Sequence, residues 1–481
     1  MVDNDFTKEQ LIAEYSEKLM DGSAALFAGA GLSVPAGFVN WKELLRSTAA
    51  DLGLTVDKEY DLIAVAQYYE NRRGNRTLLS ERLIGAFTKK TQPTDNHRLI
   101  AQLPIHTVWT TNYDQLLEEA FKAQHKRVDV KRRNEAVSQW RPGTDVVVFK
   151  MHGDVDEPEN AVLTKRDYES YDRDHELFTI RLKSDLVSFT FLFLGFSFTD
   201  PNIDYILSRV RNLTGKSPMQ HYCILKRPTP PATPDAKADY EYECRKLALR
   251  IEDLKHFAVQ TLLIDDYAEV TEILRELNRR AFKNNVFVSG GAAIGTPTFD
   301  LDRLGRFARA LGRRLIESDR NVISGYGLNV GAPLLVGAVG GANLSPTSIG
   351  ERLILRPFPR AIEPERREEV YREWRESMVA LAGFAVFLSG NRYREGSSTE
   401  TEDSTGVAKE FELAMAQGLR CCPIPVGATG FVAEALWKRV TADLPKYYGA
   451  VDVSREMAVL GDASKSNDEL IDAIMSIVDR A

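Results

Sequence analysis

The sequence predicts an α/β protein made of two Rossmann-like domains, each with a doubly wound parallel sheet. Short apolar runs rich in β-branched and aromatic residues alternate with stretches of helical periodicity along both halves of the chain, which is the pattern of βαβ units. An apolar run enters a glycine-rich turn twice, at residues 26–31 and again at 285–295. The length of 481 residues allows two or three domains that each bury a core.

Composition places the chain among ordinary globular proteins, with 43% hydrophobic and 27% charged residues. The net charge of −7 indicates no general attraction to nucleic acid. The N-terminus is polar and acidic, unlike a signal peptide, and no apolar run approaches the ~20 residues that span a bilayer. Four cysteines in a chain of this length do not suggest a disulfide scaffold. We therefore expect a cytoplasmic protein that binds neither membrane nor nucleic acid.

The first domain is expected to span residues 1–283. Residues 7–20 predict an entry helix, and apolar positions at helical spacing over residues 55–100 predict a helical insertion over the nucleotide cleft. The segment 226–238 holds four prolines, so it is either a domain linker or, as we prefer, a surface loop. The expected strands lie at residues 107–109, 146–149, 191–194, 222–225 and 262–267, and a closing helix at 269–280.

The first glycine-rich turn, at residues 26–33, has the composition of a βα turn that receives a dinucleotide. Its glycines would let the backbone approach a pyrophosphate, and a following helix would offer unpaired N–H groups and a positive dipole end. The alternative is an ordinary strand-to-helix connection. Three more motifs follow in order, each beside an apolar segment, at residues 110–114, 150–154 and 195–197.

This ordered set resembles the sirtuin family, whose pattern runs Gly-Ala-Gly-x-Ser, Thr-Gln-Asn-x-Asp, a His followed by Gly, and Gly-x-Ser. The resemblance covers roughly the first 280 residues. In sirtuins these segments surround NAD, so the resemblance implies that Asn112 and His152 are the catalytic residues, beside the nicotinamide ribose. The NAD-binding residues that it implies are Ala28, Gly29, Ala30, Gly31, Ser33, Asp114, Gly195 and Ser197.

Two departures separate the chain from the deacylase sirtuins. Those enzymes follow the glycine turn with Pro-Asp-Phe-Arg, whereas Val39-Asn40-Trp41-Lys42 stands here. They also hold a structural zinc on two Cys-x-x-Cys pairs, and neither the cysteines nor the histidines of this chain have metal-ligand spacing. We therefore expect no metal site and no true cofactor. An enzyme that attacks NAD itself, as its substrate, is favoured over a protein deacylase.

Cleavage of the nicotinamide–ribose bond resembles glycoside hydrolysis, with a neutral leaving group and an oxocarbenium-like transition state. His152 can act as a base on a water or a ribose hydroxyl, and Asn112 can donate to the ribose or hold the water. Alternatively, His152 is a satisfied buried histidine and Asn112 belongs to an Asx turn. Asp114 binds a ribose or caps the next helix. Ser33 and Ser197 contact phosphate or ribose oxygens, or close local turns.

The second domain is expected to span residues 284–481 and again begins with a strand that enters a glycine turn, at residues 285–295. Further strands are expected near residues 322–328, 353–357 and 385–388. This order resembles the SLOG family, related to the LOG nucleotide-processing enzymes. In that family an Arg-Lys stretch upstream of a Met, and a Glu after a Gly-Gly-x-Gly-Thr turn, face a nucleotide. The ligand-binding residues implied here are Ser289, Gly290, Gly291, Arg356, Arg375, Asn391 and Glu410.

The glycine turn of that family is missing. In its place Asn391 is followed by a polar, acidic stretch over residues 392–405, which we expect to be a mobile loop. A phosphoribohydrolase would need a tight phosphate turn against its Glu, so the departure favours ligand sensing over chemistry.

The order of the domains, sirtuin-like and then SLOG-like, resembles the effectors of Thoeris anti-phage defence systems. The resemblance implies an NAD+ hydrolase that is activated when its SLOG domain binds a cyclic ADP-ribose isomer made by a TIR-domain partner protein. It also implies a homotetramer that forms larger assemblies when activated. Three alternatives stay open: a protein deacylase, a non-catalytic nucleotide receptor and, weakest, a LOG-type phosphoribohydrolase.

Overall fold

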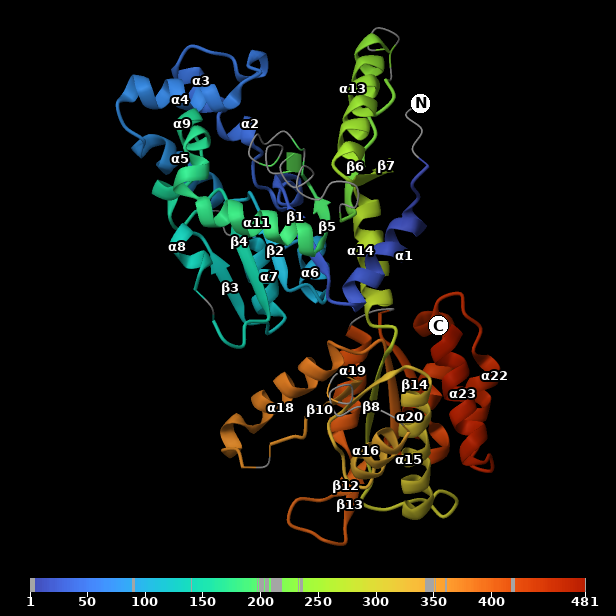
Figure 1. The fold of residues 1–481 in the computed structure, drawn as a ribbon. Helices are drawn as coiled ribbons and strands as arrows, with labels where there is room; N and C mark the ends of the chain where they lie inside the picture. The colour runs from blue at the N-terminus through green and yellow to red at the C-terminus, as the bar shows by residue number, and fades with distance from the viewer. Residues whose placement is uncertain are drawn as a thin grey trace. The chain divides into compact units, whose positions relative to one another are not determined.

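The computed structural model describes residues 5–88, 91–139, 141–196, 198, 203, 207–208, 219–231, 233, 237–341, 350, 352–359, 361–416 and 420–480. The chain divides into two compact units, Met1–Leu277 and Asn278–Ala481, which Figure 1 shows as a blue-to-yellow half and a yellow-to-red half. None of the helices in these described ranges is long and apolar enough to cross a membrane.

The first unit contains a seven-stranded parallel sheet in the order β3-β4-β2-β1-β5-β6-β7. The central strands are buried along their whole length, which is why they read as continuous apolar runs. The edge strand β3 alternates half-buried and buried residues and carries two charges, so no apolar run marked it. The strands are β1 (Ala24–Ala28), β2 (Thr107–Thr110), β3 (Val128–Lys131), β4 (Val146–Lys150), β5 (Thr190–Leu194), β6 (His221–Lys226) and β7 (Val259–Ile264).

Helices flank this sheet, and the predicted entry helix and helical insertion are both present. Thr7 and Gln10 form a capping box that begins α1. The insertion packs Leu79 and Leu83 against Tyr113 and Leu163 of the sheet loops. Its helices gather in one group beside the strands, at the upper left of Figure 1. The main helices are α1 (Lys8–Met20), α3 (Arg46–Asp51), α4 (Leu62–Arg73), α5 (Thr77–Phe87), α6 (Asp95–Gln102), α7 (Leu116–Ala123), α9 (Lys165–Glu169), α11 (Glu176–Ser188), α13 (Lys237–His256) and α14 (Ala268–Ala281).

The helix expected directly after the first glycine turn is absent from this described stretch, so that prediction is wrong. Strand β1 is followed by two single-turn 3-10 helices, Ala30–Leu32 and Val34–Ala36, and the second ends at Gly37 with φ +91°. The next α-helix, α2 (Trp41–Leu44), has only four residues. A left-handed glycine so soon after Pro35 ends the turn before a helix can propagate. Among the described residues 29–44, no long helix offers its N-terminus to this turn.

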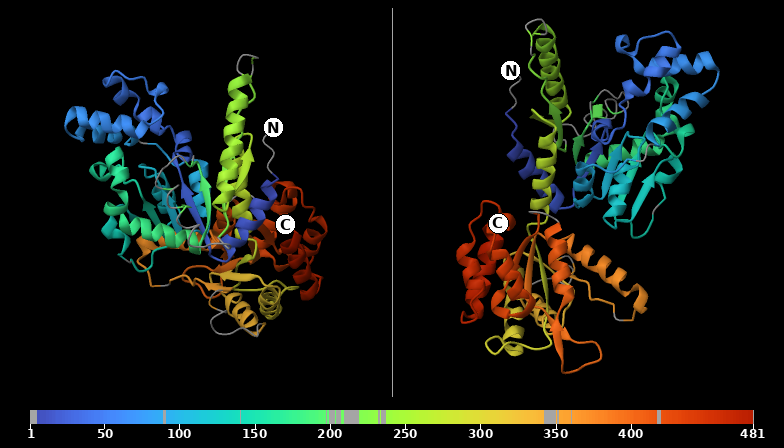
Figure 2. Two further views of the ribbon diagram at one scale, coloured as in Figure 1. Left: turned by 45° about the horizontal axis from the view of Figure 1, so that its top comes forward. Right: turned by 180° about the vertical axis from the view of Figure 1, so that it is seen from behind.

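The second unit contains a five-stranded parallel sheet in the order β10-β9-β8-β11-β14. Together with the first sheet it confirms the predicted α/β class with two parallel sheets. Figure 2 shows α18 and the pair α22 and α23 on opposite flanks of this unit. Its main elements are β8 (Asn285–Gly291), α15 (Leu301–Glu317), β9 (Asn321–Ser324), α16 (Gly331–Gly340), β10 (Leu353–Leu355), α18 (Pro364–Val379), β11 (Phe384–Ser389), α19 (Thr405–Ala416), β14 (Cys422–Pro425), α20 (Phe431–Thr441), α22 (Ser454–Leu460) and α23 (Asn467–Arg480).

The stretch expected to be a mobile loop, residues 392–405, contains an antiparallel hairpin instead. Strand β12 (Asn391–Tyr393) pairs with β13 (Thr401–Asp403). Arg394 pairs with Glu400 at 2.7 Å and Arg392 pairs with Glu402 at 2.8 Å, so the alternating charges hold the hairpin together. The many charged residues that suggested disorder therefore form ion pairs between the two strands.

Candidate functional site

The four motifs of the first unit meet at one edge of the sheet. They follow β1, β2, β4 and β5, which are neighbours in the order β4-β2-β1-β5. The register aligns their last residues, because Ala28 lies opposite both Thr110 and Leu194, and Thr110 lies opposite Lys150. Segments that follow such strands leave the sheet side by side, at the edge where α/β folds bind ligands.

The glycines of the first turn allow two backbones to pack against each other. The Gly31 N–H donates to the Gly195 carbonyl at 2.9 Å, and the Gly29 N–H donates to the Leu194 carbonyl at 2.9 Å. A Cβ on Gly29 would lie 2.4 Å from the Gly195 oxygen, and Gly195 itself has φ +63°. This contact accounts for the glycines without a ligand, and their approach to a pyrophosphate stays a prediction. Ala28 ends the buried strand, whereas Ala30 is exposed.

Asn112 connects the loop after β2 to this turn. Its side-chain Nδ2 donates to the Gly29 carbonyl at 3.0 Å and to Ser33 Oγ at 3.1 Å. The residue is buried, and its Oδ1 has no hydrogen bond within the described ranges. Both amide hydrogens are therefore used for structure, while a buried acceptor is left for a ligand or a water. Ser33 thus accepts a bond from a distant loop, and its predicted contact with a phosphate or ribose oxygen stays a prediction.

His152 lies on the turn after β4 and is buried among aromatic rings. Its ring stands edge-on to Tyr168 and Tyr171, with centroids 5.5 and 6.5 Å away. Tyr171 donates its hydroxyl to the Met151 carbonyl at 3.0 Å, and the Val162 N–H donates to the His152 carbonyl at 2.9 Å. These contacts hold the imidazole and shield it from bulk water.

Asp114 lies two residues before helix α7 and bonds its first residue through one carboxylate oxygen. Its Oδ1 accepts the N–H of Leu116, the first residue of that helix, at 3.1 Å. Its Oδ2 is buried without a hydrogen bond among the described residues. Burial lowers the pKa of nearby His97 to about 4, against the opposing charge of Asp114. Asp114 therefore bonds the first N–H of α7 from outside the helix, whereas Gln115 holds the N-cap position, and the contact of Asp114 with a ribose stays a prediction.

A buried group of charges beneath these loops was not predicted from the sequence. Lys150 is fully buried, and its Nζ lies 2.6 Å from Asp154 Oδ2 and 3.1 Å from Glu118 Oε1. Burial opposes the charge of Lys150, but Glu118 and Asp154 raise its pKa overall. Burial raises the pKa of Glu118, whereas Lys150 outweighs burial and lowers the pKa of Asp154. The sequence signal for this charged group is the pair Lys150 and Asp154, which stand two positions before and after His152.

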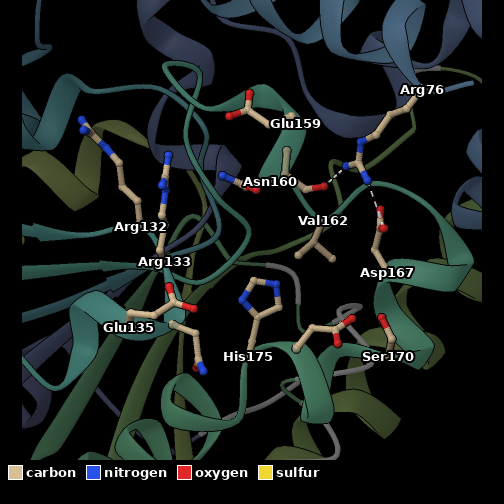
Figure 3. Close-up of a pocket in the computed structure, with 13 residues that line it drawn as sticks. Arg76, Arg132, Arg133, Glu135, Glu159, Asn160, Val162, Asp167, Ser170 and His175 are labelled. Atoms are coloured by element: carbon tan, nitrogen blue, oxygen red, sulfur yellow. Dashed lines mark hydrogen bonds and ion pairs between the residues drawn. The ribbon is translucent and has the colours of Figure 1, made fainter.

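A polar cavity of about 270 Å³ lies beside the His152 turn. Figure 3 shows Arg76, Arg132 and His175 around its hollow, with Arg76 bonded to Asp167. His175 stacks on Tyr171 with centroids 4.6 Å apart, and Tyr171 in turn contacts the His152 ring edge-on. None of the predicted site residues is among the lining residues. Predicted Ser197 lies outside the described residues.

In the second unit the structure brings Ser289, Arg375 and Glu410 together. Ser289 Oγ donates to Glu410 Oε2 at 2.5 Å, and Arg375 Nε lies 3.8 Å from Glu410 Oε1. The Arg375 guanidinium also lies over the rings of Phe358 and Tyr371, at 5.3 and 5.7 Å. Burial raises the pKa of Glu410 to about 7 against the effects of Ser289 and Arg375. Three predicted residues from β8, α18 and α19 thus form one buried cluster.

The other predicted residues of this unit have more local surroundings. Asn391 accepts the N–H groups of Ala293 and Ile294 at 2.8 and 3.0 Å, so it holds the loop after β8. Gly290 and Gly291 end β8, and a Cβ on Gly290 would lie 2.7 Å from the Leu388 carbonyl oxygen. Arg356 follows β10, and its N–H donates to the Ser324 carbonyl at 3.0 Å.

The buried Glu410 predicts a pH-dependent stability. A folded-state pKa of about 7, above the ordinary 4.5, means that its contribution is complete below pH 4.5 and is lost as the pH rises through 7. Glu410→Gln stays neutral at every pH. At pH 8 its free energy of unfolding should therefore exceed that of the parent by up to about 3 kcal/mol, and it should unfold at a higher temperature. Thermal unfolding at pH 5 and pH 8 checks this, and an equal difference at both pH values would contradict it.

Comparison with known proteins gives matches along nearly the whole chain. Residues 106–245 match the SIR2-like domain family, and residues 269–481 match the Sir2- and TIR-associating SLOG family. The chain is 39% identical to the NAD(+) hydrolase ThsA of Bacillus cereus (strain MSX-D12), with 98% of each chain covered. It is 38% identical to that of Cytobacillus dafuensis, with 98% of this chain and 96% of the relative covered. It is 39% identical to that of Acinetobacter baumannii (strain 532279), with 92% of each covered.

Proposed function

The chain belongs to the family of ThsA NAD(+) hydrolases, and from this premise we propose that it hydrolyses the nicotinamide–ribose bond of NAD+ in anti-phage defence. The observation that supports the proposal is that the loops of Asn112 and His152 follow the aligned ends of the neighbouring strands β2 and β4. Both residues are buried: the Asn112 amide is bonded to the first glycine turn, and the His152 ring packs against two tyrosine rings, as groups that must orient a reacting water should be held.

In the proposed reaction, a water oxygen attacks C1′ of the nicotinamide ribose, and the bond from C1′ to the pyridinium nitrogen breaks. The bonding electron pair goes to nicotinamide, which leaves neutral and needs little acid assistance. His152 takes the proton of the water. Asn112 Oδ1 accepts a hydrogen bond from that water, because its amide hydrogens are already engaged with Gly29 and Ser33. Of the two roles predicted for Asn112, the geometry supports holding the water.

The deacylase alternative has less support. Cys223 lies in β6 and Cys422 in β14, and both are buried with a raised thiol pKa. Neither is placed to form the paired cysteines of a structural zinc. The segment at Val39-Asn40-Trp41-Lys42 begins the short helix α2. A catalytic site for NAD+ alone therefore accounts better for the chain.

Activation is proposed to occur at the Ser289–Arg375–Glu410 cluster. A cyclic ADP-ribose isomer offers a pyrophosphate for the Arg375 guanidinium and ribose hydroxyls for the Glu410 carboxylate. Arg375 Nε has no hydrogen bond within the described ranges, so a donor is available there. The nucleotide would be supplied by a TIR-domain partner protein, and the active form would be a homotetramer or a larger assembly.

The test is nicotinamide release from NAD+ by the purified full chain. Reactions would contain no nucleotide, or a cyclic ADP-ribose isomer closed through N1 of adenine or through a ribose 2′ or 3′ oxygen. Release with at least one isomer supports the proposal. NAD+ binding without turnover under every condition would favour a nucleotide receptor, and NAD+-dependent removal of acyl groups from acyl-lysine peptides would favour a deacylase.

Activity should not depend on a metal ion. Among the residues that the structure describes, no group of three or more His, Cys, Asp or Glu side chains is placed to hold one. After exhaustive chelator treatment, nicotinamide release should stay within about twofold of the untreated rate. Elemental analysis run beside the assay decides the matter, because stoichiometric zinc that is lost together with activity would overturn the prediction.

A further inference from the structure

Lys150 occupies an unusual position between the two loops that carry the proposed catalytic residues. Its ammonium donates to the Tyr113 carbonyl at 3.2 Å and to the Asp114 carbonyl, which follow Asn112 directly. On the other side it pairs with Asp154 at 2.6 Å, two residues beyond His152. One buried cation thus contacts both loops.

The surrounding bonds make this contact a rigid one. Glu118, in helix α7, lies 3.1 Å from the Lys150 Nζ. Asp154 also accepts the Gln115 side-chain amide at 2.8 Å, and the Val155 N–H donates to the Tyr113 carbonyl at 3.0 Å. Arg132 Nε lies 3.2 Å from Asp154 Oδ2. Several hydrogen bonds and ion pairs therefore join the two loops. Among the described residues that make these contacts, Lys150 is the only fully buried cation.

We propose that Lys150 is a positioning residue for NAD+ hydrolysis, which keeps Asn112 and His152 in the mutual geometry that the reaction needs. The inference rests on the proposed function for its kinetic consequence. Lys150 touches neither substrate nor the reacting water. It acts through the Tyr113 and Asp114 carbonyls and through Asp154, and a displacement of about 1 Å in such a pair of groups can cost on the order of 10²-fold in rate.

The chain provides a matched control in Lys131. This lysine is also buried and pairs with a buried carboxylate, Asp129, at 2.6 Å. Its ammonium also donates to the Gln139 carbonyl, at 2.5 Å. It lies on the edge strand β3, and none of these partners belongs to the loops of Asn112 or His152. Loss of either lysine leaves a buried carboxylate without its cation, so both changes should lower stability.

The experiment compares full-length Lys150→Met and Lys131→Met with the parent. Nicotinamide release would be measured with the cyclic ADP-ribose isomer that activates the parent. We expect Lys150→Met to lose roughly tenfold to a hundredfold in kcat with KM for NAD+ within about threefold. Lys131→Met should keep kcat within about threefold of the parent. Both variants should unfold at a lower temperature than the parent. Equal falls in kcat, or a parental kcat in Lys150→Met, would overturn the proposal.

Hydrogen exchange gives a readout that does not need turnover. In Lys150→Met, amides of both loops, around residues 112–116 and 152–156, should exchange faster than in Lys131→Met. Unchanged exchange in both loops would overturn the inference even if the parent proved inactive, and an inactive parent would refute the proposed function alone. If Lys150→Met does not fold, Asp154→Asn replaces it, because it weakens the tie to the His152 turn but keeps Lys150. Its kcat should fall about tenfold, and a parental kcat would contradict the proposal.

Discussion

His152→Ala and Asn112→Ala are each expected to abolish nicotinamide release, with a loss on the order of 10²-fold or more. His152 is the base in the proposed reaction, and Asn112 holds the attacking water through its buried Oδ1. Both side chains are buried in the loops that follow the aligned ends of β2 and β4. Single-turnover and steady-state release of nicotinamide from NAD+ measure the loss directly.

The fold must survive these changes for the result to count. Circular dichroism, thermal unfolding and calorimetric binding of the activating cyclic ADP-ribose isomer should match the parent within error. His106→Ala is the control, because His106 is exposed and its Nδ1 contacts the Asp145 carbonyl, at 3.0 Å, away from both motifs. That variant should keep the parental rate. Near-normal turnover in His152→Ala or in Asn112→Ala would show that the assigned mechanism is wrong.

Arg375→Ala should require on the order of 10²-fold more activator for the same rate of NAD+ cleavage. A ligand shifts a conformational equilibrium only by its differential affinity for the two states, so loss of a buried charge contact reduces activation directly. Truncation of one partner of a buried charged contact costs about 2–5 kcal/mol. The Arg375 side chain is only 9% exposed, so its contact with a pyrophosphate would be little screened by solvent.

Calorimetry with the cyclic ADP-ribose isomer, run beside the turnover assay, tests this prediction. Arg372→Ala is the matched control on the same helix, because Arg372 is 61% exposed and pairs only weakly with Glu376, at 3.8 Å. It should bind and respond like the parent. Unchanged affinity in both Arg375→Ala and Glu410→Ala would place the sensor pocket elsewhere in the second unit.

The residue types within each strand decided whether that strand could be predicted from the sequence. The central strands β1, β2 and β5 are buried on both faces, so their sequences are unbroken apolar runs that stand out in the chain. Strand β3 alternates and carries Asp129 and Lys131, and β14 contains two prolines, so neither shows such a run. The hairpin of β12 and β13 was mistaken for a mobile loop because its charges pair across strands that the sequence alone does not bring together.

The candidate site divides in the same way. The order of four motifs, each after an apolar run, was enough to place Asn112 and His152 at one edge of a parallel sheet, because parallel strands end at a common edge. The structure brings together Ser289, Arg375 and Glu410, which the family resemblance had indicated, and their contact with a ligand stays a prediction. In contrast, the side-chain oxygen of Asn391 already accepts the N–H groups of Ala293 and Ile294 in the loop after β8.

By itself, the sequence determined the fold class, the domain order and the strand ends that carry the chemistry, since these depend on local hydrophobic patterns and on motif order. Only the tertiary structure decided how the groups at those ends interact. Gly29 and Gly31 contact Gly195, which is more than a hundred positions away in the sequence and is brought close by the pairing of β1 with β5. The ties between Lys150, Glu118 and Asp154 likewise depend on distances of a few ångströms between separate loops. Such distances are set by the packing of the whole domain, and no local pattern of residues encodes them.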